Sequence, residues 1–303
     1  MRRFSRMQTV LLIAFLIAVW GLSWPILKIA LTFSPPILFT GMRTLLGGLV
    51  LLIIAIPRYK RLNFKQTWPI YLICALLNVI LYHGLHTIGL NYMPSGLLAA
   101  IVYLQPVLVG IFAWLWLGEA MYDLKIVGLI LGFLGVGIIS GAGLLGQISI
   151  IGILLALGSS LSWALGTIYV KKIGTVVDSI WLVTLQFIVG GIVMIAVGTG
   201  SESWSDIVWN PTFILCLLFT AIFVFALGWL VYFELIFAGE ASKVSSYTFL
   251  IPTVAILMGT LFMDEPFTIS LMIGLVLILI SIYYVNRTPR KVGVLTSEEK
   301  FIQ

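Results

Sequence analysis

Residues 105–135 read QPVLVGIFAWLWLGEAMYDLKIVGLILGFLG, and a related pattern returns near the other end of the chain. In both places a proline stands 13 residues before a glutamate, which stands nine residues before a glycine. One offset of 146 residues relates the two sets: Pro106, Glu119 and Gly128 map onto Pro252, Glu265 and Gly274. Each copy reads as an apolar helix interrupted by a proline, an acidic turn and a second apolar helix. The repeat predicts a chain built from two related halves.

The composition predicts that lipid is the main solvent of this chain. Its 303 residues are 61% apolar and only 9% charged, with a mean hydropathy of +1.16, whereas soluble domains carry about 25% charged residues. Runs of about 20 apolar residues cross a bilayer. Ten such runs can be marked: 10–31, 38–56, 69–90, 95–117, 126–144, 148–170, 180–198, 211–237, 244–263 and 269–285.

The basic residues predict the orientation of these runs. With ten spans, both termini lie on one side, and 15 of the 17 lysines and arginines fall on that side. The other two, Lys28 and Arg43, lie within spans. Loops rich in lysine and arginine stay in the cytoplasm. We therefore expect a multi-pass protein of the cell membrane with both termini in the cytoplasm. The excess of lysine and arginine over acidic residues then reflects the orientation of the chain in the membrane and does not indicate nucleic-acid binding.

Five spans in each half imply that the second half is inserted upside down. A further offset of 143 residues relates the early helices: Trp20, Arg43 and Gly47-Gly48 map onto Trp163, Gln186 and Gly190-Gly191. The predicted fold is an all-α integral membrane protein of ten transmembrane helices in two inverted five-helix repeats. The repeats cover residues 1–145 and 146–286, and residues 287–303 form a cytoplasmic tail. Inverted repeats are typical of secondary transporters, whose substrate binds near the midplane between the halves.

Several segments resemble one known family. They are GLNYMPSGLLAA at 89–100, Gln105-Pro106, Gly118-Glu119, and Trp20-Gly21 with its echo Trp163-Ala164. With the paired spacings, these are similar to the EamA-type ten-helix exporters of the drug/metabolite transporter superfamily, over nearly the whole chain. The resemblance implies export of amino acids, related metabolites or toxic analogues, often in exchange for protons. Many members carry glutamate before the first proline, where this chain has Gln105, so the resemblance does not imply a titrating carboxylate there.

Polar residues inside the predicted spans are the candidate binding residues. Asn78, Tyr82 and His86 recur every four residues on one helical face, and His83 borders them. Such a stripe in a membrane helix favours a cavity over lipid, although a buried histidine is often purely structural. The two histidines are the only side chains here with an unperturbed pKa near neutrality, and they are the candidate acceptors of a coupling proton.

Arg43 and two interrupted helices complete the candidate site. Arg43 is either an anchor reaching the outer headgroups or a counter-ion for a substrate carboxylate, and we favour the cavity. Pro106 and Pro252 each free a carbonyl one turn earlier, which must be protected by protein or line a watery cavity; a plain packing kink is the alternative. The remaining candidates are aromatic or polar residues of the matching helices: Trp20, Tyr103, Gln105, Trp163, Tyr232 and Tyr247.

The sequence favours a transporter over an enzyme. It contains no Gly-x4-Gly-Lys-Ser/Thr, His-Glu-x-x-His or Gly-x-Ser-x-Gly motif and no aspartate-rich cluster, so we expect no ATP drive, catalytic residues, metal or cofactor. The predicted function is secondary active export of a small metabolite by alternating access. A lipid-carrier flippase and a passive channel on the same fold are the alternatives. The expected partners are a small solute and the bilayer, and protons are one candidate for the coupling ion. The sequence does not identify the substrate, the direction of transport or the oligomeric state.

Overall fold

The computed structural model describes residues 4–92, 95–140, 149–174, 176–262 and 269–287, and all its regular elements in these ranges are helices. This confirms the all-α prediction. The elements of the first matching half are α1 (Arg6–Ala30), α2 (Pro36–Ala55), η1 (Ile56–Arg61), α3 (Phe64–Ala75), η2 (Leu76–Leu81), α4 (Tyr82–Gly89), α5 (Ser95–Val102), α6 (Gln105–Leu117) and α7 (Asp123–Ser140).

The second half repeats this order. Its elements are α8 (Ile150–Ile173), α9 (Ser179–Ser201), η4 (Trp204–Asp206), α10 (Pro211–Phe219), η5 (Thr220–Gly228), α11 (Trp229–Ala238), α12 (Ala241–Ser246), η6 (Tyr247–Phe249), α13 (Leu250–Phe262) and α14 (Ile269–Asn286).

Seven helical stretches in the described part of the chain are long and apolar enough to cross a membrane: Arg6–Ala30, Pro36–Arg61, Phe64–Gly89, Leu98–Leu117, Ile150–Ile173, Ser179–Ser201 and Pro211–Ala238. Large apolar side chains such as Ile53, Leu215 and Ile269 are more than 60% exposed on their outer surfaces. In water such a surface would be unstable, so it faces lipid. The chain is a multi-pass membrane protein; ten spans remain a prediction.

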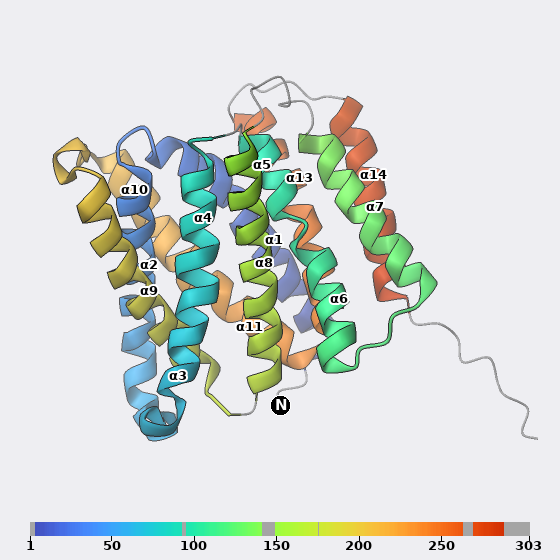
Figure 1. The fold of residues 1–303 in the computed structure, drawn as a ribbon, viewed down its shortest axis with the longest axis horizontal. Helices are drawn as coiled ribbons and strands as arrows, with labels where there is room; N and C mark the ends of the chain where they lie inside the picture. The colour runs from blue at the N-terminus through green and yellow to red at the C-terminus, as the bar shows by residue number, and fades with distance from the viewer. Residues whose placement is uncertain (1–3, 93–94, 141–148, 175, 263–268, 288–303) are drawn as a thin grey trace, which may run out of the picture.

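Equivalent helices of the two halves pack on each other at both ends of the bundle. Helix α2 lies along α9 at one end, and α7 lies along α14 at the other (Figure 1). Glycines permit the close approach of α2 and α9: a Cβ on Gly48 would lie 2.9 Å from the backbone nitrogen of Ile188, and one on Gly191 would lie 2.6 Å from that of Leu45. In the middle of the bundle, α1 packs against α13 as α8 packs against α6.

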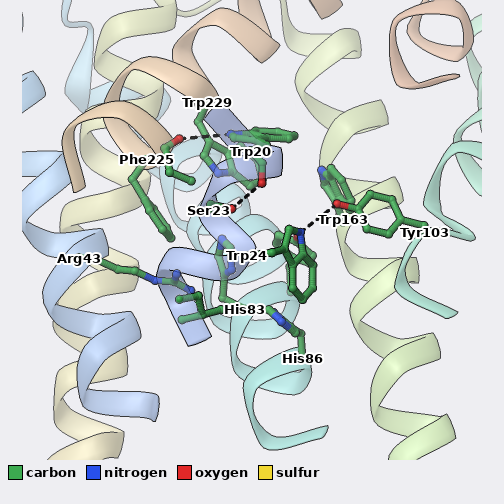
Figure 2. Close-up of a pocket in the computed structure, with 13 residues that line it drawn as sticks. Trp20, Ser23, Trp24, Arg43, His83, His86, Tyr103, Trp163, Phe225 and Trp229 are labelled. Carbon is green, nitrogen blue, oxygen red and sulfur yellow. Dashed lines mark hydrogen bonds between the residues drawn. The ribbon is translucent and has the colours of Figure 1, made fainter. Parts of the chain in front are cut away.

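Both proline-containing helices are interrupted close to the proline. Helix α5 ends at Val102, and α6 begins at Gln105 after a turn, with Pro106 in its first turn. In the second half, the 3-10 segment η6 separates α12 from α13, which carries Pro252 in its first turn. These interruptions place Tyr103 at a break in the helix, where its ring turns toward the bundle centre (Figure 2).

Two π-helical segments occupy matching positions, which the sequence analysis did not anticipate. The segment η2 joins α3 to α4, and η5 joins α10 to α11. The offset of 146 residues maps η2, residues 76–81, into η5, residues 220–228. A π-helical turn places an extra residue in the turn and rotates the face that follows it, and such turns are frequent at functional sites.

Candidate functional site

A pocket in the bundle centre brings together residues from both halves of the chain (Figure 2). It encloses about 490 Å³ of space between atoms, including the part that is open to solvent. Its lining comes from α1, α2, α4, α8, η5, α11 and the turn between α5 and α6: Trp20, Ser23, Trp24, Leu27, Arg43, Tyr82, His83, His86, Tyr103, Trp163, Val224, Phe225 and Trp229.

Aromatic rings form most of the pocket wall. Tyr82 stacks on Trp163 with ring centroids 4.9 Å apart, and Trp20 meets Trp163 edge to face at 5.9 Å. The indole N–H of Trp20 donates to the carbonyl oxygen of Val224 in η5 at 3.3 Å. Aromatic contacts of this kind add stability beyond burial alone, so the pocket has a preformed wall of packed aromatic rings.

Arg43 is the one charged residue among those that line the pocket. Its side chain comes from α2 and is only 4% exposed. The guanidinium carbon lies 5.3 Å from the ring centre of Phe39 and 4.9 Å from that of Phe225. Its Nε has no hydrogen-bond partner, and none of the described carboxylates forms an ion pair with it. The arginine is therefore held in place by aromatic faces, with hydrogen-bonding capacity left over.

The imidazoles of two histidines beside Arg43 also lack partners. His83 and His86 follow one another by almost one turn of α4, and both nitrogens of each imidazole are buried without a hydrogen bond to any described residue. The same holds for the indole nitrogen of Trp163. Buried polar atoms in a native protein are nearly always hydrogen-bonded. A polar molecule bound in the pocket would supply hydrogen-bond partners for these unpaired nitrogens.

Seven of the sequence-predicted candidates line the pocket: Trp20, Arg43, Tyr82, His83, His86, Tyr103 and Trp163. Asn78 lies instead between α3 and α4, where its amide donates to the side-chain oxygen of Gln186 on α9 at 3.2 Å. Tyr247 is half-buried in η6 and is outside the lining.

Gln105 and Tyr232 belong to a hydrogen-bonded cluster behind the aromatic wall. The amide of Gln105 donates to Thr167 at 3.4 Å and to the hydroxyl of Tyr232 at 3.3 Å. Tyr232 lies within hydrogen-bond distance of Thr167 at 3.1 Å and of Ser245 at 3.2 Å. The four residues come from α6, α8, α11 and α12, so this cluster links both halves next to the pocket.

Several lining residues are not among the sequence-predicted candidates, although the repeat carries a signal for one of them. The offset of 146 residues maps His83 onto Trp229, so the second half presents an aromatic residue where the first presents an imidazole. Phe225 is one turn before Trp229 and covers the guanidinium of Arg43. Ser23, Trp24 and Leu27 follow Trp20 along the same face of α1.

An ionic cluster joins the turn between α6 and α7 to the start of α12. Lys125, which is fully buried, lies 3.4 Å from Glu119 and 3.6 Å from Glu240. The Glu119 carboxylate accepts hydrogen bonds from the backbone of Ala241 at 2.5 Å and from the backbone and hydroxyl of Ser242. The acidic turn of the first half is therefore fixed to the start of α12 in the second.

Glu234 makes a hydrogen bond between α11 and α9. Its carboxylate accepts from the hydroxyl of Ser179, the first residue of α9. This contact gives the half-buried carboxylate a structural partner.

Comparisons with known proteins agree with the fold and with the repeat. The model of the EamA-like transporter family matches the chain twice, at residues 7–141 and 150–287. The chain is 57% identical to the uncharacterized transporter YvbV of Bacillus subtilis over 94% of both chains. It is 26% identical to a protein of Escherichia coli named probable amino-acid metabolite efflux pump, covering 88% of this chain and 91% of that protein.

A solved crystal structure shares the fold, with a TM-score of 0.81 over 93% of this chain and 97% of the other at 18% identity. Two family matches together span nearly the whole described chain, with the pocket between them. The chain belongs to the EamA-like transporter family and carries two EamA repeats.

Proposed function

We propose that this protein is a secondary active exporter of small metabolites, such as amino acids or related amphipathic compounds, in the cell membrane. The observation that carries the proposal is the central pocket: residues of both repeats line it, and it holds a buried arginine and unpartnered imidazoles. A solute bound between two halves can be exposed to either side as the halves rock against each other. The efflux-pump name of the Escherichia coli relative supports the direction.

We infer further that the repeats, residues 1–145 and 146–286, are inverted five-helix units and that ten helices cross the membrane, with residues 287–303 as a cytoplasmic tail. Packing supports this: α2 lies on its counterpart α9, and α7 on α14, as expected for elements near a two-fold axis. The concentration of lysine and arginine on the side of the termini supports a cytoplasmic location for both ends.

Single cysteines test this topology. Cysteine at Asn63, before α3, should be protected from a membrane-impermeant maleimide in intact cells, while cysteine at Ser205, in η4, should react. Both positions are exposed on the bundle, so accessibility differs only through the membrane. The native Cys74 and Cys216 are buried and free and are replaced by alanine in the background. Reaction at both positions from outside would contradict the inverted arrangement, and reaction at Asn63→Cys alone would contradict the cytoplasmic location of the termini.

Counterflow in proteoliposomes tests the transport function. Vesicles loaded with unlabelled phenylalanine, leucine, threonine or 3-phenylpropionate are diluted into the same labelled solute. A transporter should give a transient overshoot of label inside, because one binding site exchanges solute across the membrane. A passive channel equilibrates the label without an overshoot. A flippase moves a fluorescent phospholipid instead and gives no overshoot with any of these solutes.

An imposed pH gradient then tests proton coupling. If protons drive export, the gradient should produce accumulation of the solute that a protonophore abolishes. His83 and His86 both line the pocket, and glutamine cannot titrate, so His86→Gln or its matched variant His83→Gln should flatten the pH dependence of transport. An unchanged pH profile in the double variant, at normal expression, would contradict coupling through these rings.

A further inference from the structure

The charge inside the pocket is unbalanced among the described residues. Arg43 is almost fully buried, and no carboxylate lines the pocket or forms an ion pair with it in the described ranges. A guanidinium does not lose its proton in a protein. Since a buried charge without a partner is strongly unfavourable, the pocket is suited to a molecule that brings a negative charge with it.

The other unpartnered atoms around the pocket also favour an anion. The Trp163 indole nitrogen is a donor only, and each neutral imidazole of His83 and His86 offers one donor and one acceptor. The nearby carbonyl oxygen of Val224 is already occupied by the indole N–H of Trp20. Among these unpartnered atoms donors outnumber acceptors, and an ammonium group would find no carboxylate among the lining residues.

The aromatic wall of the pocket indicates what the uncharged part of the ligand is. The rings of Trp20 and Tyr82 each have their centroid within 6 Å of that of Trp163, the first edge to face and the second stacked, so packed aromatic rings form the wall opposite the arginine (Figure 2). Such walls favour a ring-shaped or planar apolar body, because aromatic pairs gain energy beyond burial. Phe39 and Phe225 cover the arginine and reduce its access to water.

We propose that the pocket selects organic anions that join a carboxylate to a planar apolar ring, with Arg43 as the residue that determines specificity. This rests on the proposed transport function. The carboxylate binds the free edge of the guanidinium, where Nε has no other partner, and the ring lies against the indole and phenol faces. Cations, neutral amides and zwitterions with the same ring bind less well, because the described lining residues supply no counter-ion for an ammonium group and an amide leaves the guanidinium charge unpaired.

Four ligands with a common skeleton test the proposal. Purified protein in lipid nanodiscs is titrated with radiolabelled 3-phenylpropionate in a scintillation proximity assay, and the label is competed with 3-phenylpropionamide, 3-phenylpropylamine and phenylalanine. The carboxylate should bind at least about tenfold more tightly than each competitor, as expected for a charge-assisted hydrogen bond. Arg43→Gln should remove the preference, and Arg43→Lys should retain part of it because the charge remains. Lys65→Gln, which removes a charge from an exposed residue, should change nothing.

The outcomes separate this proposal from the transport function. Equal affinity for the four ligands, tighter binding of the amine or phenylalanine, no binding of 3-phenylpropionate, or an unchanged preference in a folded Arg43→Gln would each overturn the selectivity. Gel filtration of each variant identifies the folded ones. If Arg43→Gln does not fold, the test is a reduced preference for the carboxylate in Arg43→Lys. Counterflow of phenylalanine or leucine would leave transport standing in all these cases. An Arg43-dependent preference without counterflow of any solute would support the selectivity and contradict transport.

Discussion

Replacing Glu119 by glutamine is expected to lower the free energy of unfolding by about 3 kcal/mol, as for other broken buried ion pairs. The carboxylate is only 8% exposed, and its partner Lys125 is fully buried. It also accepts hydrogen bonds from the first two residues of α12, Ala241 and Ser242. Glutamine keeps the shape but removes the charge, leaving Lys125 with Glu240 at 3.6 Å as its remaining carboxylate and with the carbonyl oxygen of Ala120 at 3.0 Å. The effect is measured by reversible SDS titration of the purified protein in mixed micelles.

Two further variants distinguish the contribution of the buried ion pair to stability from that of an exposed ion pair. Adding Lys125→Met to Glu119→Gln should recover at least about 1 kcal/mol, because the second change removes the buried charge whose nearer carboxylate the first change neutralised. Lys243→Met breaks a pair with Glu240 that is 20% and 41% exposed, and should cost less than about 1 kcal/mol. Equal losses for Glu119→Gln and Lys243→Met would contradict a stabilising role for the buried cluster.

The repeat offsets allowed much of the architecture to be predicted from the sequence. They identified Gly47-Gly48 and Gly190-Gly191 as equivalent pairs, and the structure brings Gly48 and Gly191 to the crossing of α2 and α9. Glycine is informative here because its position depends on backbone approach rather than on the choice of a side-chain rotamer. The all-helical class follows equally directly from composition, since a helix satisfies its own backbone hydrogen bonds in lipid.

The stripe on helix α3–α4 shows where sequence periodicity fails. Asn78, Tyr82 and His86 share one face only if the helix has 3.6 residues in each turn. The π-helical segment η2 includes Asn78 and ends just before Tyr82, so it changes the rotation between them. Asn78 consequently faces Gln186, while Tyr82 and His86 face the pocket. Nothing in residues 76–81 distinguishes a π-turn from an α-turn by composition.

Contacts between residues of the two halves also could not be predicted from the sequence. Glu119 was recognised as a marker of the repeat, yet its partner Ala241 lies 122 residues away. Gln105 was expected to reach the solute, and the structure places it against Thr167 and Tyr232. An amide can satisfy its hydrogen bonds with any nearby hydroxyl, so residue type alone does not decide between a solute and a neighbouring helix.

Gly191→Ala is expected to destabilise the protein by about 3 kcal/mol, at the upper end of the usual cost of overpacking. An added Cβ would lie 2.6 Å from the backbone nitrogen of Leu45 and 2.7 Å from its Cα. Backbone atoms of α2 cannot rotate away as a side chain can, so the two helices must separate along their contact. Separation would also move Arg43, which is two residues before Leu45 on α2.

Gly200→Ala on the same helix is the matched control. No atom lies within 4 Å of a Cβ added there, so the only remaining effect is the reduced flexibility of the unfolded chain, which should stabilise by up to about 1 kcal/mol. The two variants make the same chemical change on α9 and differ only in what the methyl group meets. SDS titration should therefore give free energies of unfolding that differ by about 3–4 kcal/mol, the sum of the two effects. Similar values for both would mean that α2 and α9 lie farther apart in the membrane, and the glycine pairs would then have no packing role.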